Sequence, residues 1–196
     1  MFFVIFLALG IIIGYILKGK LSNLINVNIR MIYLPIAALV FSIIANKLQW
    51  YTARHFVLYI LIIVFVIVNI KESKYYIIAG LGFLSNFIVI SANNLTMPVG
   101  YKIEELRLYI NAYNMLINGQ IPGYALASQQ TKLYFLADIF YVPFLPKLGF
   151  FSLGDALLGI GGMLLIASFM KKKPEQKSEQ ETEQKSEQEA EQLDSE

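Results

Sequence analysis

Five apolar runs, separated by short charged stretches, constrain the fold of this chain more than any other feature of its sequence. They are Met1–Leu17, Met31–Asn46, Phe56–Ile70, Tyr75–Ser91 and Phe150–Met170. An α-helix needs about 17–25 residues to cross the hydrocarbon layer of a bilayer, and each run is close to that length. Because no water satisfies peptide groups inside a bilayer, such runs are expected to be helical. The sequence therefore predicts an all-α, polytopic membrane protein with about five transmembrane helices.

The composition agrees with a membrane location. Of the 196 residues, 57% are hydrophobic, a fraction too high for an ordinary soluble domain. The chain has no Cys and a single His, His55, so we expect no metal site of the usual His and Cys kind. We also expect no other cofactor and no nucleic-acid partner. The partner that the composition indicates is the lipid bilayer.

Basic residues in the short loops predict the orientation, because such residues accumulate on the cytoplasmic side. One side would carry eight of them and the other side two, Lys47 and Arg54. The eight follow the first, third and fifth runs: Lys18, Lys20, Arg30, Lys71, Lys74, Lys171, Lys172 and Lys173. This asymmetry predicts a multi-pass protein of the cytoplasmic membrane with its N-terminus outside and its C-terminus in the cytoplasm.

The first and the third run differ from an ordinary span. Because basic residues follow Met1–Leu17 and do not precede it, this run is expected to be a retained helix and not a cleaved signal peptide. Phe56–Ile70 is short for a span, so we expect it to recruit Trp50–His55, with Arg54 reaching toward the headgroups. A re-entrant hairpin of the second and third runs is the alternative.

The segment Ala92–Gly149 is the part long enough to form an extracytoplasmic structure. Apolar residues from Ile103 to Ile117 recur at three- and four-residue spacing, which predicts an amphipathic helix that ends at Gly119. Beyond it, several Pro and Gly residues from Pro122 to Gly149 are expected to interrupt regular structure. The two domains of the prediction are thus a membrane domain, residues 1–170, and a tail, residues 171–196.

The tail repeats a charged octapeptide, first over Glu175–Thr182 and then over Glu183–Ala190. Eight residues is not a helical heptad, and the repeat offers almost nothing apolar to bury. We therefore expect residues 171–196 to form a disordered cytoplasmic tail.

Gly10 and Gly14 form a Gly-x-x-x-Gly pattern in the first run. Small residues at this spacing allow another helix to approach closely. The pattern predicts either packing within one subunit or a homodimer through Gly10 and Gly14.

In the fourth run, Asn86 is expected to donate a hydrogen bond to another helix.

Two aspartates are the candidates for chemistry. Ser152 and Asp155 fit the capping-box pattern at the start of the last run, in which each side chain satisfies a backbone N–H. Asp138 and Asp155 are the only Asp residues before the tail, and both are expected at the extracytoplasmic membrane surface. Two carboxyl groups that share a proton could activate water for peptide hydrolysis.

Polar residues and turns gather where the spans meet the long segment. We predict that they form one polar cluster at the outer membrane face, made of Asn93, Met97, Pro98, Asp138, Ser152 and Asp155. Such a cluster would organise the long segment over the helices as a structural or partner-binding surface.

Three stretches resemble one family. They are Ser91–Val99, which contains Met97-Pro98-Val99, then Thr131–Ile139 and Phe151–Asp155 with the apolar run behind it. Together with the basic turn after the first run, they are similar to a bacterial family of small multi-helix membrane proteins known as a domain of unknown function. The resemblance implies a fold and a membrane location for about residues 1–170, and no activity.

A second, partial similarity is to lipoprotein signal peptidase, an aspartyl membrane peptidase. Its last helix opens with Phe-Asn-x-Ala-Asp, and Phe151–Asp155 resembles this, with Ser152 and Gly154 in place of Asn and Ala. Leu136–Phe140 resembles a stretch before that helix, whereas the Asn-x-x-Asp-Arg motif of the family has no counterpart. We expect a structural or partner-binding membrane module, with an aspartyl membrane peptidase that uses Asp138 and Asp155 as the alternative.

Overall fold

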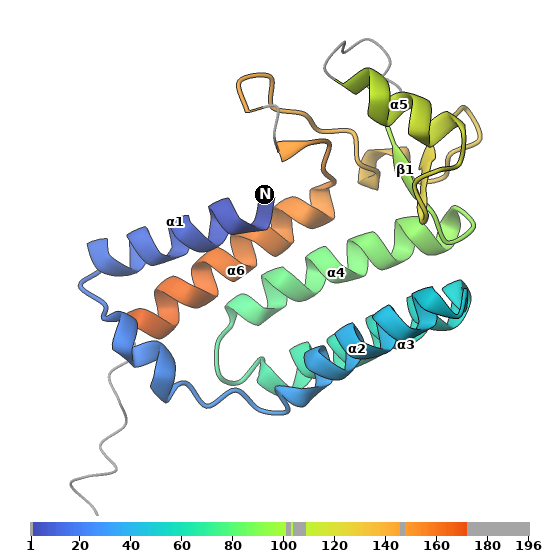
Figure 1. The fold of residues 1–196 in the computed structure, drawn as a ribbon. Helices are drawn as coiled ribbons and strands as arrows, with labels where there is room; N and C mark the ends of the chain where they lie inside the picture. The colour runs from blue at the N-terminus through green and yellow to red at the C-terminus, as the bar shows by residue number, and fades with distance from the viewer. Residues whose placement is uncertain (1, 101–102, 104–108, 146–147, 172–196) are drawn as a thin grey trace, which may run out of the picture.

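The computed structural model describes residues 2–100, 103, 109–145 and 148–171, and helices dominate them (Figure 1). The long helices are α1 (Phe2–Ile16), α2 (Tyr33–Lys47), α3 (Tyr51–Asn69), α4 (Tyr75–Ala92) and α6 (Leu153–Lys171). The shorter elements are η1 (Leu21–Asn26), β1 (Met97–Val99), α5 (Ile110–Ile117), β2 (Tyr124–Leu126) and η4 (Tyr134–Leu136).

The long helices lie side by side in the order α1, α6, α4, α3 and α2 (Figure 1). α6, the last helix among the described residues, is thus inserted between α1 and α4. The rings of Phe2 and Phe151 lie 4.7 Å apart, so α1 and α6 begin at the same end of the row. His55 Nε2 lies 2.9 Å from Ser91 Oγ, so α3 begins where α4 ends. We call the end where α4 ends and α6 begins the loop end.

The opposite end of the row we call the basic end. There the backbone N–H of Lys20 donates to the carbonyl of Met170 over 2.9 Å. The rings of Tyr76 and Phe169 meet at 6.3 Å, which joins the start of α4 to the close of α6. The described cations at this end are Lys18, Lys20, Arg30, Lys71, Lys74 and Lys171.

Three helices, α3, α4 and α6, are long and apolar enough to cross a membrane. α1 and α2 are also apolar but have 15 residues each, or about 22 Å at the usual helical rise. α3 begins at Tyr51, five residues before the predicted Phe56, and so gains the length that the short third run lacked. The chain is therefore mostly helical with three candidate spans, and five spans stay a prediction.

Close backbone packing joins the central helices. A Cβ on Gly161 of α6 would lie 2.6 Å from the backbone nitrogen of Ala79 in α4, and a Cβ on Gly82 would lie 2.5 Å from the carbonyl oxygen of Gly154. Both distances are too short for real contacts, so no larger residue fits without a shift. Small residues thus let α4 and α6 approach each other backbone to backbone.

Gly10 and Gly14 are buried against α6 of the same chain. A Cβ on Gly10 would lie 2.7 Å from the carbonyl oxygen of Met163, and one on Gly14 would collide with the side chain of Met170. The Gly-x-x-x-Gly pattern predicted either packing within one subunit or a homodimer, and this contact is packing within one subunit. Homodimerisation through these glycines stays a prediction.

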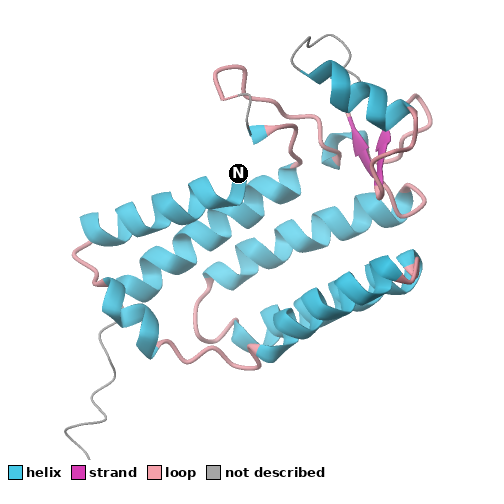
Figure 2. Cartoon of the chain, viewed as in Figure 1, coloured by secondary structure: helices cyan, strands magenta, loops and turns pink. Residues whose placement is uncertain are grey.

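The segment between α4 and α6 contains a small parallel sheet, which corrects the expectation of an all-α chain (Figure 2). β1 pairs with β2 in the register Met97 to Tyr124 and Val99 to Leu126. The expectation of no regular structure after Pro122 was wrong, because pairing with a distant strand orders residues 124–126. The sheet lies over the loop end, beside the end of α4 (Figure 2).

α5 confirms part of the predicted amphipathic helix. It covers Ile110–Ile117, and Gly119 follows it with a φ of +65°, a conformation that favours glycine. Residues 104–108 of the predicted helix lie outside the described residues. The predicted disordered tail also lies outside them, except for Lys171, which closes α6.

Candidate functional site

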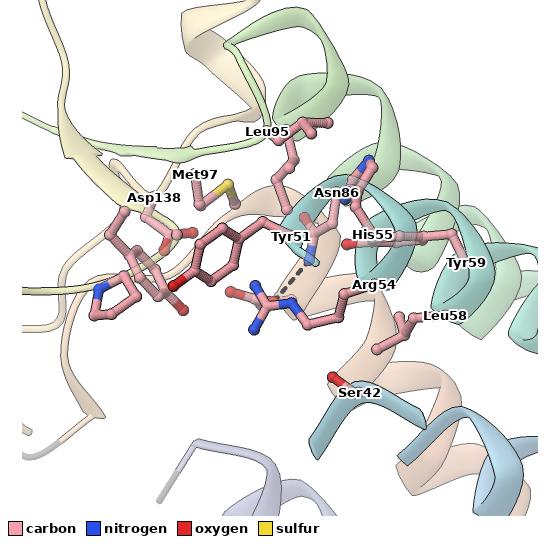
Figure 3. A pocket seen from close by; sticks show the side chains of 15 residues that line it. Ser42, Tyr51, Arg54, His55, Leu58, Tyr59, Asn86, Leu95, Met97 and Asp138 are labelled. Atoms are coloured by element: carbon pink, nitrogen blue, oxygen red, sulfur yellow. Dashed lines mark hydrogen bonds between the residues drawn. The ribbon is translucent and has the colours of Figure 1, made fainter. Parts of the chain in front are cut away.

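A pocket of about 370 Å³ lies at the loop end, between the helices and the small sheet (Figure 3). Both candidate aspartates line it. The polar side chains around it include Arg54, His55, Asn86, Tyr124, Asp138 and Asp155. The apolar ones include Leu58, Ile90, Leu95 and Met97. Residues from α2, α3, α4, β1 and α6 thus converge on one cavity.

The sheet positions Asp138. Its backbone N–H donates to the carbonyl of Pro98 over 2.9 Å, and its own carbonyl accepts from the N–H of Gly100 over 2.9 Å. These bonds form a parallel bridge beside Val99, so residue 138 extends the sheet on the other edge of β1. The backbone of Asp138 is therefore fixed by strand pairing, and its side chain is 6% exposed.

A second bridge ties this strand to α6. Phe140 and Phe151 exchange two backbone hydrogen bonds, of 3.1 and 3.0 Å, in an antiparallel pair. Their rings stack with centroids 5.8 Å apart. Because Phe151 immediately precedes the capping box of α6, this bridge brings the two aspartates, 17 residues apart in sequence, to the same pocket.

Asp155 is held in a closed set of hydrogen bonds. Its Oδ1 accepts from Asn86 Nδ2 over 2.9 Å, and its Oδ2 accepts from the backbone N–H of Ser152 over 3.2 Å. Ser152 Oγ in turn accepts from the N–H of Asp155 over 2.9 Å and donates to Asn86 Oδ1 over 2.8 Å. The capping box is therefore formed as predicted, and Asn86 makes the predicted bond between helices. In this network the carboxylate of Asp155 acts as an acceptor.

Asp138 has the opposite environment. Its Oδ1 is buried without a hydrogen-bond partner among the described residues. Burial and, second, the charge of Asp155 raise the pKa of the Asp138 carboxyl to about 8. Burial disfavours the charged form because the pocket solvates it less well than water, and a nearby like charge acts in the same direction. At neutral pH, Asp138 is thus mainly a protonated acid that can donate a hydrogen bond.

Sequence reasoning missed two further groups of the pocket. Arg54, expected to reach toward the headgroups, carries its guanidinium into the cavity (Figure 3). Tyr124 enters through the pairing of β2, and burial together with the charges of Asp138 and Asp155 raises the pKa of its phenol, against the opposing effect of Arg54. Tyr124 is thus a neutral hydrogen-bond donor. Only the tertiary structure brings Tyr124 to the aspartates, so no local pattern could have identified it.

His55 completes the polar lining. Its ring stacks on Phe87 with centroids 5.2 Å apart, and its Nε2 lies 2.9 Å from Ser91 Oγ. Within the parts of the chain that the structure describes, no three His, Cys, Asp or Glu side chains come together as a metal site would require. His55 therefore has a packed position between α3 and α4 at the edge of the pocket.

The six residues of the predicted polar cluster take three kinds of place. Met97, Asp138 and Asp155 line the pocket. Pro98 and Ser152 are not among the lining residues, but they hold the two aspartates through the bonds described above. Asn93 lies apart from the pocket, where its side chain bonds the backbone N–H and carbonyl of Lys132 over 2.9 and 2.8 Å.

The fold and the pocket define a class: a mostly helical protein, compatible with a membrane, whose helices carry a polar pocket at one end. Within that class, the chain belongs to a family of unknown function, DUF5317, whose model matches residues 26–167. The resemblance to a domain of unknown function is thereby confirmed. No curated protein and no solved structure matches the chain. The partial similarity to lipoprotein signal peptidase is therefore not supported.

Proposed function

We propose that the chain crosses the cytoplasmic membrane five times, with its N-terminus and residues 92–149 outside and residues 171–196 in the cytoplasm. The five long helices alternate in direction along the chain, including α6, which begins at the loop end where α4 ends, and this supports spans of alternating direction. Among the described residues of the basic end, the cations far outnumber the one acid, Glu72, which pairs with Arg30 over 3.2 Å. This excess of positive charge supports a cytoplasmic basic end. Apolar side chains exposed on α1 and α2, such as Ile12, Ile36 and Ile43, fit contact with lipid.

The function that the pocket supports best is acid–base hydrolysis of an amide bond by Asp138 and Asp155. One observation carries this proposal: two carboxyl groups line the same cavity in opposite hydrogen-bonding states. Asp155 is an acceptor, whereas Asp138 has a raised pKa and a buried oxygen without a partner. Pairs of acids whose environments separate their protonation states are the usual arrangement for acid–base catalysis.

In the proposed reaction, every proton that one group releases is taken up by another. Water attacks the amide carbon while its proton passes to Asp155, and Asp138 donates its proton to the carbonyl oxygen. The C–N bond of the tetrahedral intermediate then breaks. The proton on Asp155 passes to the leaving nitrogen, and Asp138 recovers a proton as the carbonyl re-forms. Tyr124, a neutral phenol at the same pocket, is placed to donate a further hydrogen bond to the same carbonyl oxygen while it gains electron density in the transition state.

The experiment compares cleavage products in membranes that contain the wild-type protein, Asp138→Asn or Asp155→Asn. Mass spectrometry of new protein N-termini should find cleavages that depend on both carboxyl groups. Glu72→Gln removes a carboxylate at the basic end and serves as the matched control, which should retain the products. Cleavage should also fall as the pH rises through about 8, because Asp138 then loses its proton. Products that persist in both Asn variants at normal protein levels would exclude this function.

A structural or partner-binding module is the second candidate, and the complete capping box favours it. Asp155 is satisfied by Ser152 and Asn86 without any substrate. In such a module, Asp155→Asn retains an acceptor oxygen, so stability should fall by about 1 kcal/mol and function should survive. In a hydrolase, the same change should abolish cleavage while the protein accumulates normally. The Asn variants therefore separate the two candidates.

A further inference from the structure

Arg54 gives the pocket a cation that the proposed hydrolysis does not use. It lies in the first turn of α3, and its guanidinium points into the cavity (Figure 3). Its Nη1 donates to Asn46 Oδ1 over a long 3.3 Å, and its Cζ lies 5.9 Å from the centroid of the Tyr51 ring. Among the described residues Arg54 forms no ion pair; the one found there joins Arg30 and Glu72. Most of its donors are thus available to a ligand.

The backbone of the 122–124 turn closes over this guanidinium. A Cβ on Gly123 would lie 3.5 Å from Arg54 Nη2, and Gly123 has a φ of +80° that favours glycine. Gly123 also anchors the sheet, because its carbonyl accepts from the N–H of Met97 over 2.8 Å. The sheet therefore covers Arg54 from outside and leaves its donors facing the aspartates' cavity.

The pocket also places apolar side chains beside Arg54. Arg54 lies in the first helical turn, whereas Leu58 lies one turn further along the helix, and Ile90 faces the cavity from α4. Trp50 and Tyr51 are exposed at the start of α3, as aromatic residues at a membrane interface commonly are. The cavity thus offers a guanidinium near the start of α3 together with apolar contacts, an arrangement that suits an amphiphile with an anionic head.

We propose that Arg54 forms an oxyanion subsite of this pocket, which binds the phosphate of an anionic membrane amphiphile beside Asp138 and Asp155. The planar fork of a guanidinium matches the oxygens of a phosphate. That the bound amphiphile is a substrate, or the anchor of one, rests on the proposed hydrolysis. The binding itself does not.

Trp50 provides the test, because it is the only Trp in the chain and its carbonyl accepts from the N–H of Arg54 over 2.8 Å. The full-length protein is placed in bilayers that contain brominated phosphatidylglycerol or brominated phosphatidylcholine, and quenching of Trp50 fluorescence gives their relative binding constants. The wild-type protein should prefer phosphatidylglycerol. Arg54→Gln should lower this preference about tenfold, as expected when a charge-assisted contact is lost. Arg54→Lys, which retains the charge without the fork, should fall between the two.

Lys47→Gln is the matched control, because it removes a charge from the same end of the helices at a residue outside the pocket. It should leave the preference close to the wild-type value. An equal loss of preference in Lys47→Gln and Arg54→Gln would overturn the subsite, because it would reflect a diffuse attraction between the lipid and the charged surface. The absence of any preference in the wild-type protein would also overturn it, because the pocket would then not select the anionic headgroup. If inorganic phosphate relieves the quenching by phosphatidylglycerol, the subsite accepts a free oxyanion. If it does not, the subsite requires the lipid, and both results support phosphate recognition.

The Asn variants separate this proposal from the hydrolysis. Asp138→Asn and Asp155→Asn should abolish cleavage and retain the preference for phosphatidylglycerol. A preference that persists in a protein without any cleavage activity would support the subsite and exclude the hydrolysis. Cleavage that depends on both aspartates, in a protein without headgroup preference, would support the hydrolysis and overturn the subsite.

Discussion

At the residue scale, two identical side chains acquire different chemistry from their surroundings. Asp155 accepts bonds from a helix N-terminus and from Asn86, whereas Asp138 sits on a strand with one oxygen buried and unpartnered. Burial raises the pKa of Asp138, and the negative charge of Asp155 raises it further. Asp155 therefore helps to keep Asp138 protonated. The difference therefore arises from position and not from residue type.

The raised pKa of Asp138 predicts that stability declines as the pH rises. The folded protein holds this proton up to a pKa of about 8, whereas the unfolded chain releases it near its ordinary value of 3.8. The stabilising contribution is complete below the lower value and is lost as the pH rises through about 8. In denaturant unfolding in detergent, the free energy of unfolding should fall more steeply with rising pH for the wild-type protein than for Asp138→Asn, whose side chain stays neutral. Equal pH slopes would contradict a buried, protonated Asp138.

The bonds around Asn86 predict a large effect from a single substitution. Asn86→Ala removes the partner of both Asp155 Oδ1 and Ser152 Oγ, and Ser152 is fully buried. Leaving buried polar groups unpaired should lower the free energy of unfolding by about 1–3 kcal/mol. Asn46→Ala, at an exposed position with one long bond, should change it by less than about 0.5 kcal/mol. Similar effects of the two variants would argue against the network.

At the scale of elements, the contact between α4 and α6 holds the site together. A Cβ on Gly154 would collide with Asn86 Oδ1 and lie 2.8 Å from the carbonyl oxygen of Gly82. Gly154→Ala should therefore separate the helices or displace Asn86, at a cost of about 1–3 kcal/mol in the free energy of unfolding. Gly162→Ala is the control on the same helix, because its Cβ would meet Leu7 at an ordinary 3.7 Å. It should be neutral or slightly stabilising, since Ala is the better helix former. Thermal unfolding of both variants tests this, because only Gly154→Ala should lower the midpoint temperature.

The contact between α1 and α6 allows the two interpretations of Gly10 and Gly14 to be separated. Gly10→Ala should destabilise the monomer, because the new Cβ would press on the backbone at Met163. If the same glycines instead form a homodimer, the substitution should dissociate it with little loss of monomer stability. Unfolding measurements and light scattering of the purified protein distinguish these results. Dissociation without destabilisation would contradict packing within one subunit.

At the scale of the whole molecule, the orientation in the membrane can be tested because the chain has no Cys. Ser22 lies in η1 at the basic end, and Ser128 follows β2 at the loop end, and both are exposed. In intact cells, a thiol reagent that cannot cross the membrane should label Ser128→Cys and not Ser22→Cys, which should react only after the membrane is opened. The reverse pattern would invert the proposed topology.

The sequence by itself determined what depends on residues close together in the chain. Apolar runs of the right length predicted the long helices, because helical bonds and burial in an apolar environment both act along the run. The capping box of Ser152 and Asp155 and the end of α5 at Gly119 were likewise local patterns. Each of them involves residues at most a few positions apart, so their geometry follows from the helix alone.

Only the tertiary structure decided how these pieces meet. The pairing of β1 with β2 joins residues 97 and 124, and the bridge at Val99 joins that sheet to Asp138. Strands of three residues carry too little pattern to reveal their partners, because their stability comes from the neighbours they pair with. The insertion of α6 between α1 and α4 was likewise invisible in a row of similar apolar runs. The meeting of Asp138 and Asp155, and the approach of Arg54 and Tyr124 to them, therefore depended on contacts between distant parts of the chain.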